Sequence, residues 1–97
     1  MIEVRETPTF TAWMEALKDR DGRAKITARL RRLAMGNPGD VKSVGGQVSE
    51  LRVDHGPGYR IYFTRRGVTV ALLLCSGDKR TQAKDIKLAQ SMVSQLE

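Results

Sequence analysis

Two arginines, Arg52 and Arg60, stand on either side of a glycine-proline-glycine run. Glycine and proline favour turns, so the sequence predicts a β-hairpin with strands over 48–53 and 59–64. Side chains alternate between the two faces of a strand. One face of this hairpin is therefore apolar, carrying Leu51, Val53, Tyr59, Ile61 and Phe63. The opposite face is polar, carrying Glu50, Arg52, Arg60 and Tyr62.

The polar face has the groups that RNA cleavage without a metal requires. A base must take the proton of the ribose 2′-hydroxyl, cations must stabilise charge on the phosphate, and an acid must protonate the departing 5′-oxygen. Arg52 and Arg60 could clamp the phosphate, with Glu50 neutralising the two like charges. Glu50 or His55 could be the base. Lys79 or His55 could be the acid, Lys79 if neighbouring cations lower its pKa.

Four further residues are candidate RNA contacts. Tyr59 or Tyr62 could stack on a base, although the strand alternation also points Tyr59 toward the core. Arg80, like Lys79, follows the next apolar strand and can overhang the polar face of the hairpin. Gln82, in the same polar connection, is the fourth candidate RNA contact.

The composition predicts one globular domain over 1–97. Hydrophobic residues make up 40% of the chain and charged residues 29%, which is typical of a folded protein with one modest core. Seventeen Lys and Arg against eleven Asp and Glu give a net charge of +6. A positive field concentrates anionic partners, such as nucleic acid, an acidic protein or an anionic membrane surface.

Several features favour a soluble cytoplasmic protein without membrane association. Cys75 is the single cysteine, so no internal disulfide framework is possible, which fits a reducing compartment. The N-terminus lacks the basic region and apolar core of a signal peptide. The longest apolar run, 70–75, is far shorter than the roughly 18–20 residues that span a bilayer.

The rest of the chain predicts the order β-α-α-β-β-β-α. A short strand over 2–5 precedes two amphipathic helices, the first capped by Thr9 and the second ending near Met35, with a turn at 19–22 between them. Residues 36–46 are expected to form a loop. After the hairpin come an apolar strand over 68–75 and a helix over about 82–95. We expect an α+β fold in which the helical hairpin covers one face of a mostly antiparallel sheet.

Neither a metal nor a cofactor is predicted. The single histidine and single cysteine cannot form a zinc-like cluster, and the acidic residues show no ligand spacing. No Walker loop or GxGxxG fingerprint is present, and the turn at 56–58 joins strand to strand.

Other candidates have simpler interpretations. Trp13 and Phe10 fit a helix-hairpin core better than a ligand site. Cys75 fits a buried small hydrophobe better than a nucleophile. His55 fits a solvated turn residue better than a catalyst. The basic second helix, 23–35, is either a solvated face or a grip for ribosomal RNA or an acidic partner.

These residues resemble a known family. The resemblance rests on the runs 50–52, 56–63, 73–82 and 84–86, supported by 10–13, 17–19 and 36–40. Together they look like the RelE/ParE/HigB toxin superfamily, and most like its HigB-type addiction module killer branch.

The resemblance implies a helical hairpin on a twisted antiparallel sheet of about four strands with a C-terminal helix. It also implies a type II toxin that cleaves mRNA on the ribosome and forms a hetero-oligomer with a helix-turn-helix antitoxin. Arg52, Tyr59, Arg60 and Lys79 match positions of the family motif. Two departures leave the acid and base unassigned: RelE has a tyrosine in the segment that here reads 82–86, and a lysine where this chain has Glu50.

Three functions remain open on the sequence. The first is a ribosome-dependent endoribonuclease toxin. The second is a ParE-like poison of DNA gyrase, for which Arg52 and Arg60 would be dispensable. The third is a non-catalytic module that binds nucleic acid or an antitoxin. For the enzyme, we expect Arg60 to be an exposed strand residue whose replacement leaves the fold intact.

Overall fold

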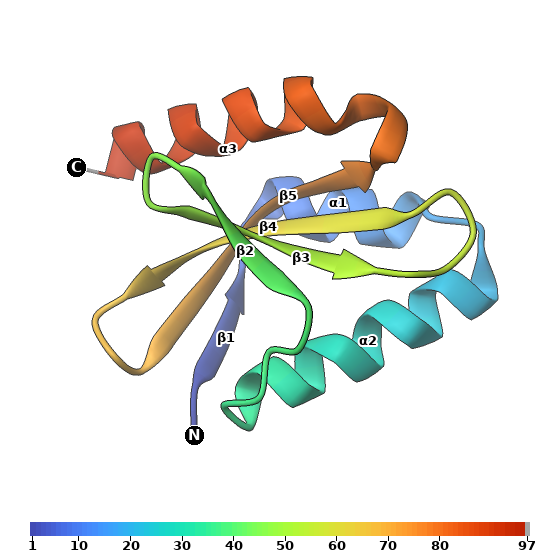
Figure 1. Cartoon of the computed structure of the whole chain (residues 1–97), viewed down its shortest axis with the longest axis horizontal. Helices are drawn as coiled ribbons and strands as arrows, with labels where there is room; N and C mark the ends of the chain where they lie inside the picture. Colours follow the sequence, from blue (N-terminus) through green and yellow to red (C-terminus); the bar gives the residue numbers. More distant parts are fainter. Residues whose placement is uncertain (97) are drawn as a thin grey trace.

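A five-stranded sheet with helices on both faces forms the protein, as the computed structural model describes it for residues 1–96 (Figure 1). The elements in chain order are β1 (Glu3–Glu6), α1 (Pro8–Ala16), α2 (Arg20–Ala34), β2 (Val41–Gly45), β3 (Val48–Val53), β4 (Tyr59–Arg66), β5 (Val70–Asp78), the 3₁₀ turn η1 (Lys79–Thr81) and α3 (Gln82–Leu96). The predicted α+β class is confirmed.

The sheet is mixed, with the spatial order β1-β5-β4-β3-β2. β1 runs parallel to β5, and the other neighbours are antiparallel. The prediction of a loop over 36–46 is wrong for Val41–Gly45, which form strand β2. The sheet therefore has five strands instead of the predicted four. Only Val41 and Val44 of this edge strand are half-buried, and the other three residues are exposed. Its pairing with β3, rather than its own hydrophobic pattern, makes it a strand.

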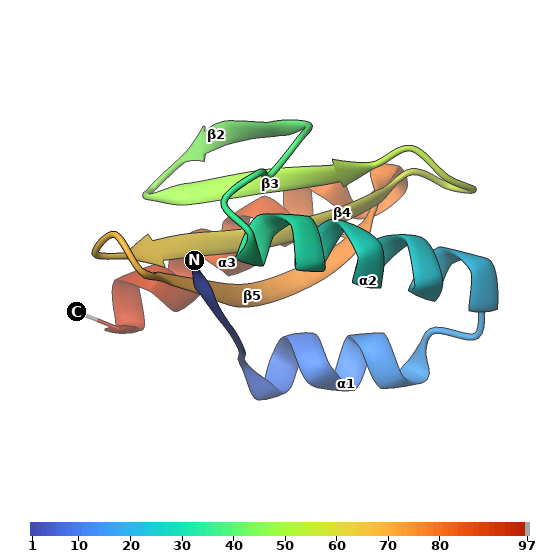
Figure 2. The ribbon, with the colours of Figure 1, turned by 90° about the horizontal axis from the view of Figure 1, so that it is seen from below.

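Helices cover both faces of the sheet. α1 and α2 run in opposite directions on one face (Figure 2), where Phe10, Ile26 and Leu33 pack against the apolar side of β3 and β4. α3 lies on the other face, where Ala89 and Val93 pack with side chains of β3, β4 and β5. The predicted helical hairpin on one face is confirmed. No helix within residues 1–96 combines the length and apolarity needed to cross a membrane.

Both helices of the hairpin begin differently from the prediction. Thr7, not Thr9, caps α1, accepting a hydrogen bond from the Phe10 amide, because Pro8 occupies the first helical turn. Asp19 caps α2 by accepting from the amide of Gly22, so residues 20–22 are helical rather than a turn. A Cβ at Gly22 would lie 2.6 Å from the Tyr59 ring, so close packing explains this glycine.

The hairpin register agrees with the sequence analysis. Leu51 faces Ile61 and Arg52 faces Arg60 across β3 and β4, so the predicted apolar and polar faces are correct. β4 and β5 each extend beyond their predicted ends. Residues 76–78, predicted as a connection, are paired with β4 instead. The strand therefore delivers Lys79 directly at its end.

Gly77 lies where β5 meets α3, and we expect Gly77→Ala to destabilise the fold. The new Cβ would lie 1.9 Å from Asp85 Oδ2 and 2.6 Å from Thr81 Oγ1. Overpacking of this kind costs about 1–3 kcal/mol, so the thermal midpoint followed by circular dichroism should fall clearly. Gly67→Asn is the control, because that glycine has φ +65° and no atom within 4 Å of a built Cβ, and asparagine tolerates this conformation. Equal midpoints for both variants would contradict the packing argument.

Candidate functional site

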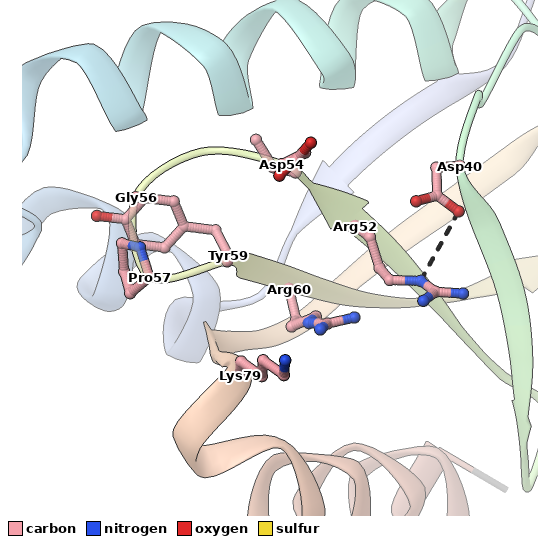
Figure 3. Close-up of a pocket in the computed structure, with 10 residues that line it drawn as sticks. Asp40, Arg52, Asp54, Gly56, Pro57, Tyr59, Arg60 and Lys79 are labelled. Carbon is pink, nitrogen blue, oxygen red and sulfur yellow. Dashed lines mark ion pairs between the residues drawn. The ribbon is translucent and has the colours of Figure 1, made fainter.

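A cavity of about 380 Å³ opens at the turn end of the hairpin (Figure 3). Three cations line it, and each comes from a different element: Arg52 from β3, Arg60 from β4 and Lys79 from η1. The remaining lining residues are Asp40, Val53, Asp54, Gly56, Pro57, Gly58 and Tyr59. The predicted meeting of these three cations is therefore present in the structure.

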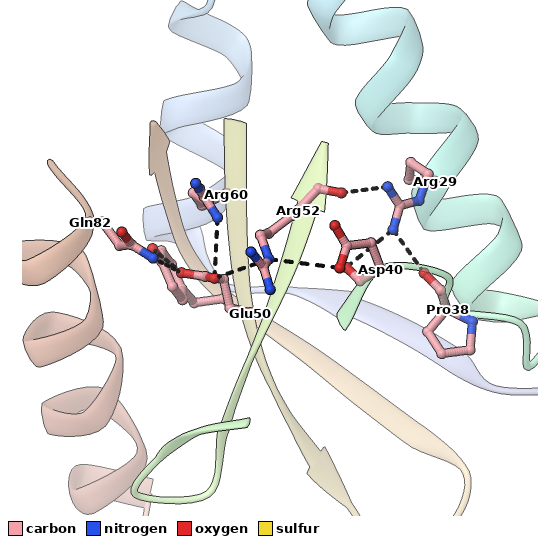
Figure 4. A network of polar contacts seen from close by, with 8 residues as sticks. Arg29, Pro38, Asp40, Glu50, Arg52, Arg60 and Gln82 are labelled. Atoms are coloured by element: carbon pink, nitrogen blue, oxygen red, sulfur yellow. Dashed lines mark hydrogen bonds and ion pairs between the residues drawn. The ribbon is translucent and has the colours of Figure 1, made fainter. Parts of the chain in front are cut away.

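Glu50 lies at the centre of the polar network behind this cavity (Figure 4). Its Oε1 is 3.4 Å from Arg60 Nη1 and 3.7 Å from Arg52 Nε. Its Oε2 accepts hydrogen bonds from Tyr62 Oη at 3.1 Å and Gln82 Nε2 at 2.7 Å. Glu50 thus neutralises the two arginines as predicted.

The burial of this network corrects three proposed roles. Glu50 has no exposed surface, so its burial argues against its assignment as the base that takes a proton from a bound ribose. Tyr62 is also fully buried, which excludes stacking on a base. Burial and the adjacent Glu50 charge raise the pKa of Tyr62 well above its usual range. Gln82, predicted to bind RNA, instead holds Glu50 in place.

Of the two arginines paired with Glu50, Arg52 is the more exposed to solvent. Its side chain is 37% exposed and lies 3.7 Å from both Asp40 Oδ1 and Glu50 Oε1. These are ion-pair distances, too long for hydrogen bonds. Its guanidinium donates no hydrogen bond to another residue within 1–96. Nε, the atom that faces these carboxylates, is buried, so the terminal nitrogens are the donors left for an anionic ligand.

Arg60 is more enclosed than the sequence suggested. Its side chain is only 11% exposed and is paired with the buried Glu50, so the expectation of an exposed strand arginine is wrong. The apolar and polar faces were assigned correctly, but α3 and η1 cover part of the polar face. Replacing Arg60 by alanine would remove a partner of a buried carboxylate and so would confound activity with stability.

Two consecutive cations, Lys79 and Arg80, line different cavities. Lys79 is exposed and lines the cationic cavity (Figure 3). Arg80 does not line it; its guanidinium is 3.0 Å from Asp78 Oδ2 and it lines a second cavity. Asp78 also caps η1 by accepting from the Arg80 amide. The structure therefore joins Lys79, but not Arg80, to Arg52 and Arg60.

His55 and Tyr59 form a separate cluster beside the start of α2. His55 Nε2 lies 3.6 Å from Asp19 Oδ2, and its ring stacks on Tyr59 with centroids 6.5 Å apart. Tyr59 donates to the same carboxylate at 2.7 Å. Burial raises the pKa of Tyr59 to about 12, whereas the Tyr59 hydroxyl and the Gly22 amide lower the pKa of Asp19. His55 does not line the cationic cavity, so neither catalytic role predicted for it has geometric support.

Arg29 is a site residue that sequence reasoning missed. From α2 it donates to the carbonyl oxygens of Arg52, Pro38 and Asp40 (Figure 4). Burial lowers its pKa. It therefore ties the backbone of β3 to the segment that carries Asp40. In the sequence, Arg29 is one of several basic residues of the second helix, and no local pattern distinguishes it from those that face solvent.

The cavity has the chemistry of a phosphate site. Three cations line it together with the exposed carboxylates of Asp40 and Asp54. Guanidinium groups in a partly desolvated site bind phosphate oxygens strongly. No cluster of three or more His, Cys, Asp or Glu side chains within residues 1–96 is placed to hold a metal ion.

We expect Glu50→Ala to lower markedly the urea concentration at which the protein unfolds. The change leaves the Arg60 guanidinium largely buried without its carboxylate, which costs about 3–5 kcal/mol. Urea unfolding followed by circular dichroism measures this loss. The control is Glu3→Ala, which breaks an exposed pair with Arg5 and should leave the midpoint nearly unchanged. A similar small effect for both variants would refute the structural role of Glu50.

Cys75 should resist alkylation in the folded protein. Burial, with a contribution from the nearby Asp85 charge, raises the pKa of its thiol to about 12, so almost no thiolate exists at pH 8. Mass spectrometry should find no iodoacetamide adduct in native protein and complete labelling in urea. Rapid native labelling would contradict the buried, unreactive assignment that the apolar strand suggested.

The comparisons with known proteins give one family and one relative. Residues 12–94 match the family model described as Phage derived protein Gp49-like (DUF891). An uncharacterised protein of Haemophilus influenzae (strain ATCC 51907 / DSM 11121 / KW20 / Rd) is 46% identical over 95 residues, covering 98% of this chain and 96% of that protein. The match takes in β2 to β5, α2, most of α1 and α3, and all three cavity cations. The chain therefore belongs to the phage-derived Gp49-like family.

Proposed function

We propose that this protein is the toxin of a type II toxin-antitoxin system and cleaves mRNA on the ribosome without a metal. The observation that carries the proposal is the convergence of Arg52, Arg60 and Lys79 on one cavity. Gp49-like family membership and the resemblance to RelE/ParE/HigB toxins support the same function. A cytoplasmic location and a helix-turn-helix antitoxin as partner in a hetero-oligomer are parts of this proposal.

In the proposed reaction the cations act on the phosphate. Arg52, the more exposed arginine, binds a non-bridging oxygen, while Glu50 keeps Arg60 pointed at the same site. Both arginines stabilise the charge that grows on the phosphoryl oxygens as the 2′-oxygen attacks. Lys79 protonates the departing 5′-oxygen. With Glu50 buried and His55 elsewhere, the exposed carboxylates of the cavity, Asp40 and Asp54, are the proposed bases for the 2′-hydroxyl.

The decisive experiment is controlled expression in a bacterium with mapping of RNA 5′ ends. The wild-type protein should arrest growth and leave mRNAs cut within codons. Arg52→Ala should lower cleavage about 100-fold or more, the usual loss when one donor to a developing oxyanion is removed. Arg66→Ala is the matched control, because Arg66 is an exposed strand arginine at the far end of β4. Circular dichroism should show that both variants are folded.

Each other outcome selects a different function. Growth arrest with intact transcripts, double-strand DNA breaks and full toxicity of Arg52→Ala would replace this proposal with a gyrase poison. Salt-sensitive RNA binding without arrest or cleavage would leave a binding module. Equal cleavage by Arg52→Ala and wild type would refute the role given to the cationic cavity.

A further inference from the structure

A second cavity, of about 410 Å³, lies between the end of α1 and the start of α3. Trp13 and Leu17 line it from the first helix and its cap, and Lys84 and Asp85 from the last. The function proposed above uses none of these residues.

The two cavities are neighbours along the hairpin turn. Pro57 and Tyr59 line both of them and form a shared wall. The consecutive residues Lys79 and Arg80 each line one cavity. The second cavity therefore adjoins the place where the cations of the first would hold the phosphate of a nucleotide.

The second cavity offers the aromatic surface that a base requires. Trp13 is half-buried, and its ring lies edge-on to Tyr59 with centroids 5.9 Å apart and an interplanar angle of 77°. Leu17 and Pro57 extend this apolar wall. Stacking of a base on an aromatic side chain is worth about 1–3 kcal/mol. Tyr62, which was expected to stack, is buried elsewhere.

The polar groups of the cavity favour a neutral ligand that donates hydrogen bonds. Asp85 is 7% exposed and its Oδ2 accepts from the Thr81 hydroxyl at 2.5 Å. Its Oδ1 accepts no hydrogen bond from any residue within 1–96. The Asp78 carboxylate, by contrast, is already engaged by Arg80. A carbonyl oxygen of a ligand placed against the Asp85 carboxylate would be repelled, whereas an amino group there would donate a hydrogen bond to Oδ1.

We propose that this cavity is a subsite for a nucleobase carrying an exocyclic amino group, which stacks on Trp13 and donates to Asp85. The donor of uracil, N3–H, lies between two carbonyl oxygens that the Asp85 carboxylate repels, whereas adenine, cytosine and guanine each present an amino group. The inference rests on the proposed function and deepens it, since it makes the protein selective for these three bases over uracil beside the scissile phosphate. Lys84 and Arg80 line the cavity and are exposed, so they attract the backbone of the bound RNA.

Trp13 is the only tryptophan of the chain, so its fluorescence reports directly on this cavity. The full chain is titrated with adenosine, guanosine, cytidine and uridine 3′-monophosphates and with inorganic phosphate, with correction for nucleotide absorption. The amino-bearing nucleotides should quench the emission to saturation, the uridine nucleotide should bind at least about tenfold more weakly, and phosphate should leave the emission unchanged.

Two variants with one control locate the effect. Asp85→Asn keeps the side-chain size but removes the charge, and it should reduce the preference for amino-bearing bases about tenfold. Lys84→Ala should weaken binding of all four nucleotides. Lys87→Ala is the control, because Lys87 is exposed on the same helix and does not line the cavity. Thermal midpoints by circular dichroism show that each variant is folded.

The outcomes separate this inference from the function on which it rests. Equal quenching by all four nucleotides, quenching by phosphate alone, or an unchanged preference in Asp85→Asn would overturn the base subsite even if the protein cleaves mRNA. Selective quenching in a protein that cleaves no mRNA would overturn the proposed function and keep the subsite.

Discussion

The ion pairing between one buried carboxylate and two arginines is the constraint on which the site depends. Glu50 has no exposed surface and lies between Arg52 and Arg60. A buried carboxylate is costly unless its oxygens are paired, so the surrounding elements must supply partners. β4 supplies Arg60 and Tyr62, and α3 supplies Gln82. The network that satisfies Glu50 also fixes the arginines, so the site cannot be rearranged without disturbing the fold.

The link between β5 and α3 places two neighbouring cations in different cavities. Gly77 allows Asp85 and Thr81 to approach the strand, and Asp78 caps the 3₁₀ turn that follows. Nearly every residue of the 77–82 segment therefore has a structural contact. This segment resembles a toxin motif for two reasons. Its residues build the geometry that puts Lys79 at the cationic cavity, and the lysine itself supplies the charge.

The arginines and lysines differ in how accessible they are to a ligand. Arg29 and Arg60 are held by carbonyl or carboxylate oxygens inside the structure, whereas Arg52 and Lys79 still face solvent. The exposed pair is small, but it lies in a concave site where the surrounding protein reduces screening by water. Local placement, rather than the total charge, is therefore what makes the cavity a candidate for binding an anionic backbone.

The amino-acid sequence by itself determined the hairpin, its register and its two faces, because a glycine-proline-glycine turn and strict alternation are local signals. It also indicated the helical hairpin, the C-terminal helix and the buried character of Cys75. Strand β2 and the enclosure of Arg60 were decided only by tertiary structure. β2 exists through its pairing with β3, and α3 covers a face that alternation alone marks as polar. The same covering removed Glu50 and Tyr62 from solvent and made them supports for the cations, since burial depends on which element packs above a residue and no local pattern encodes that.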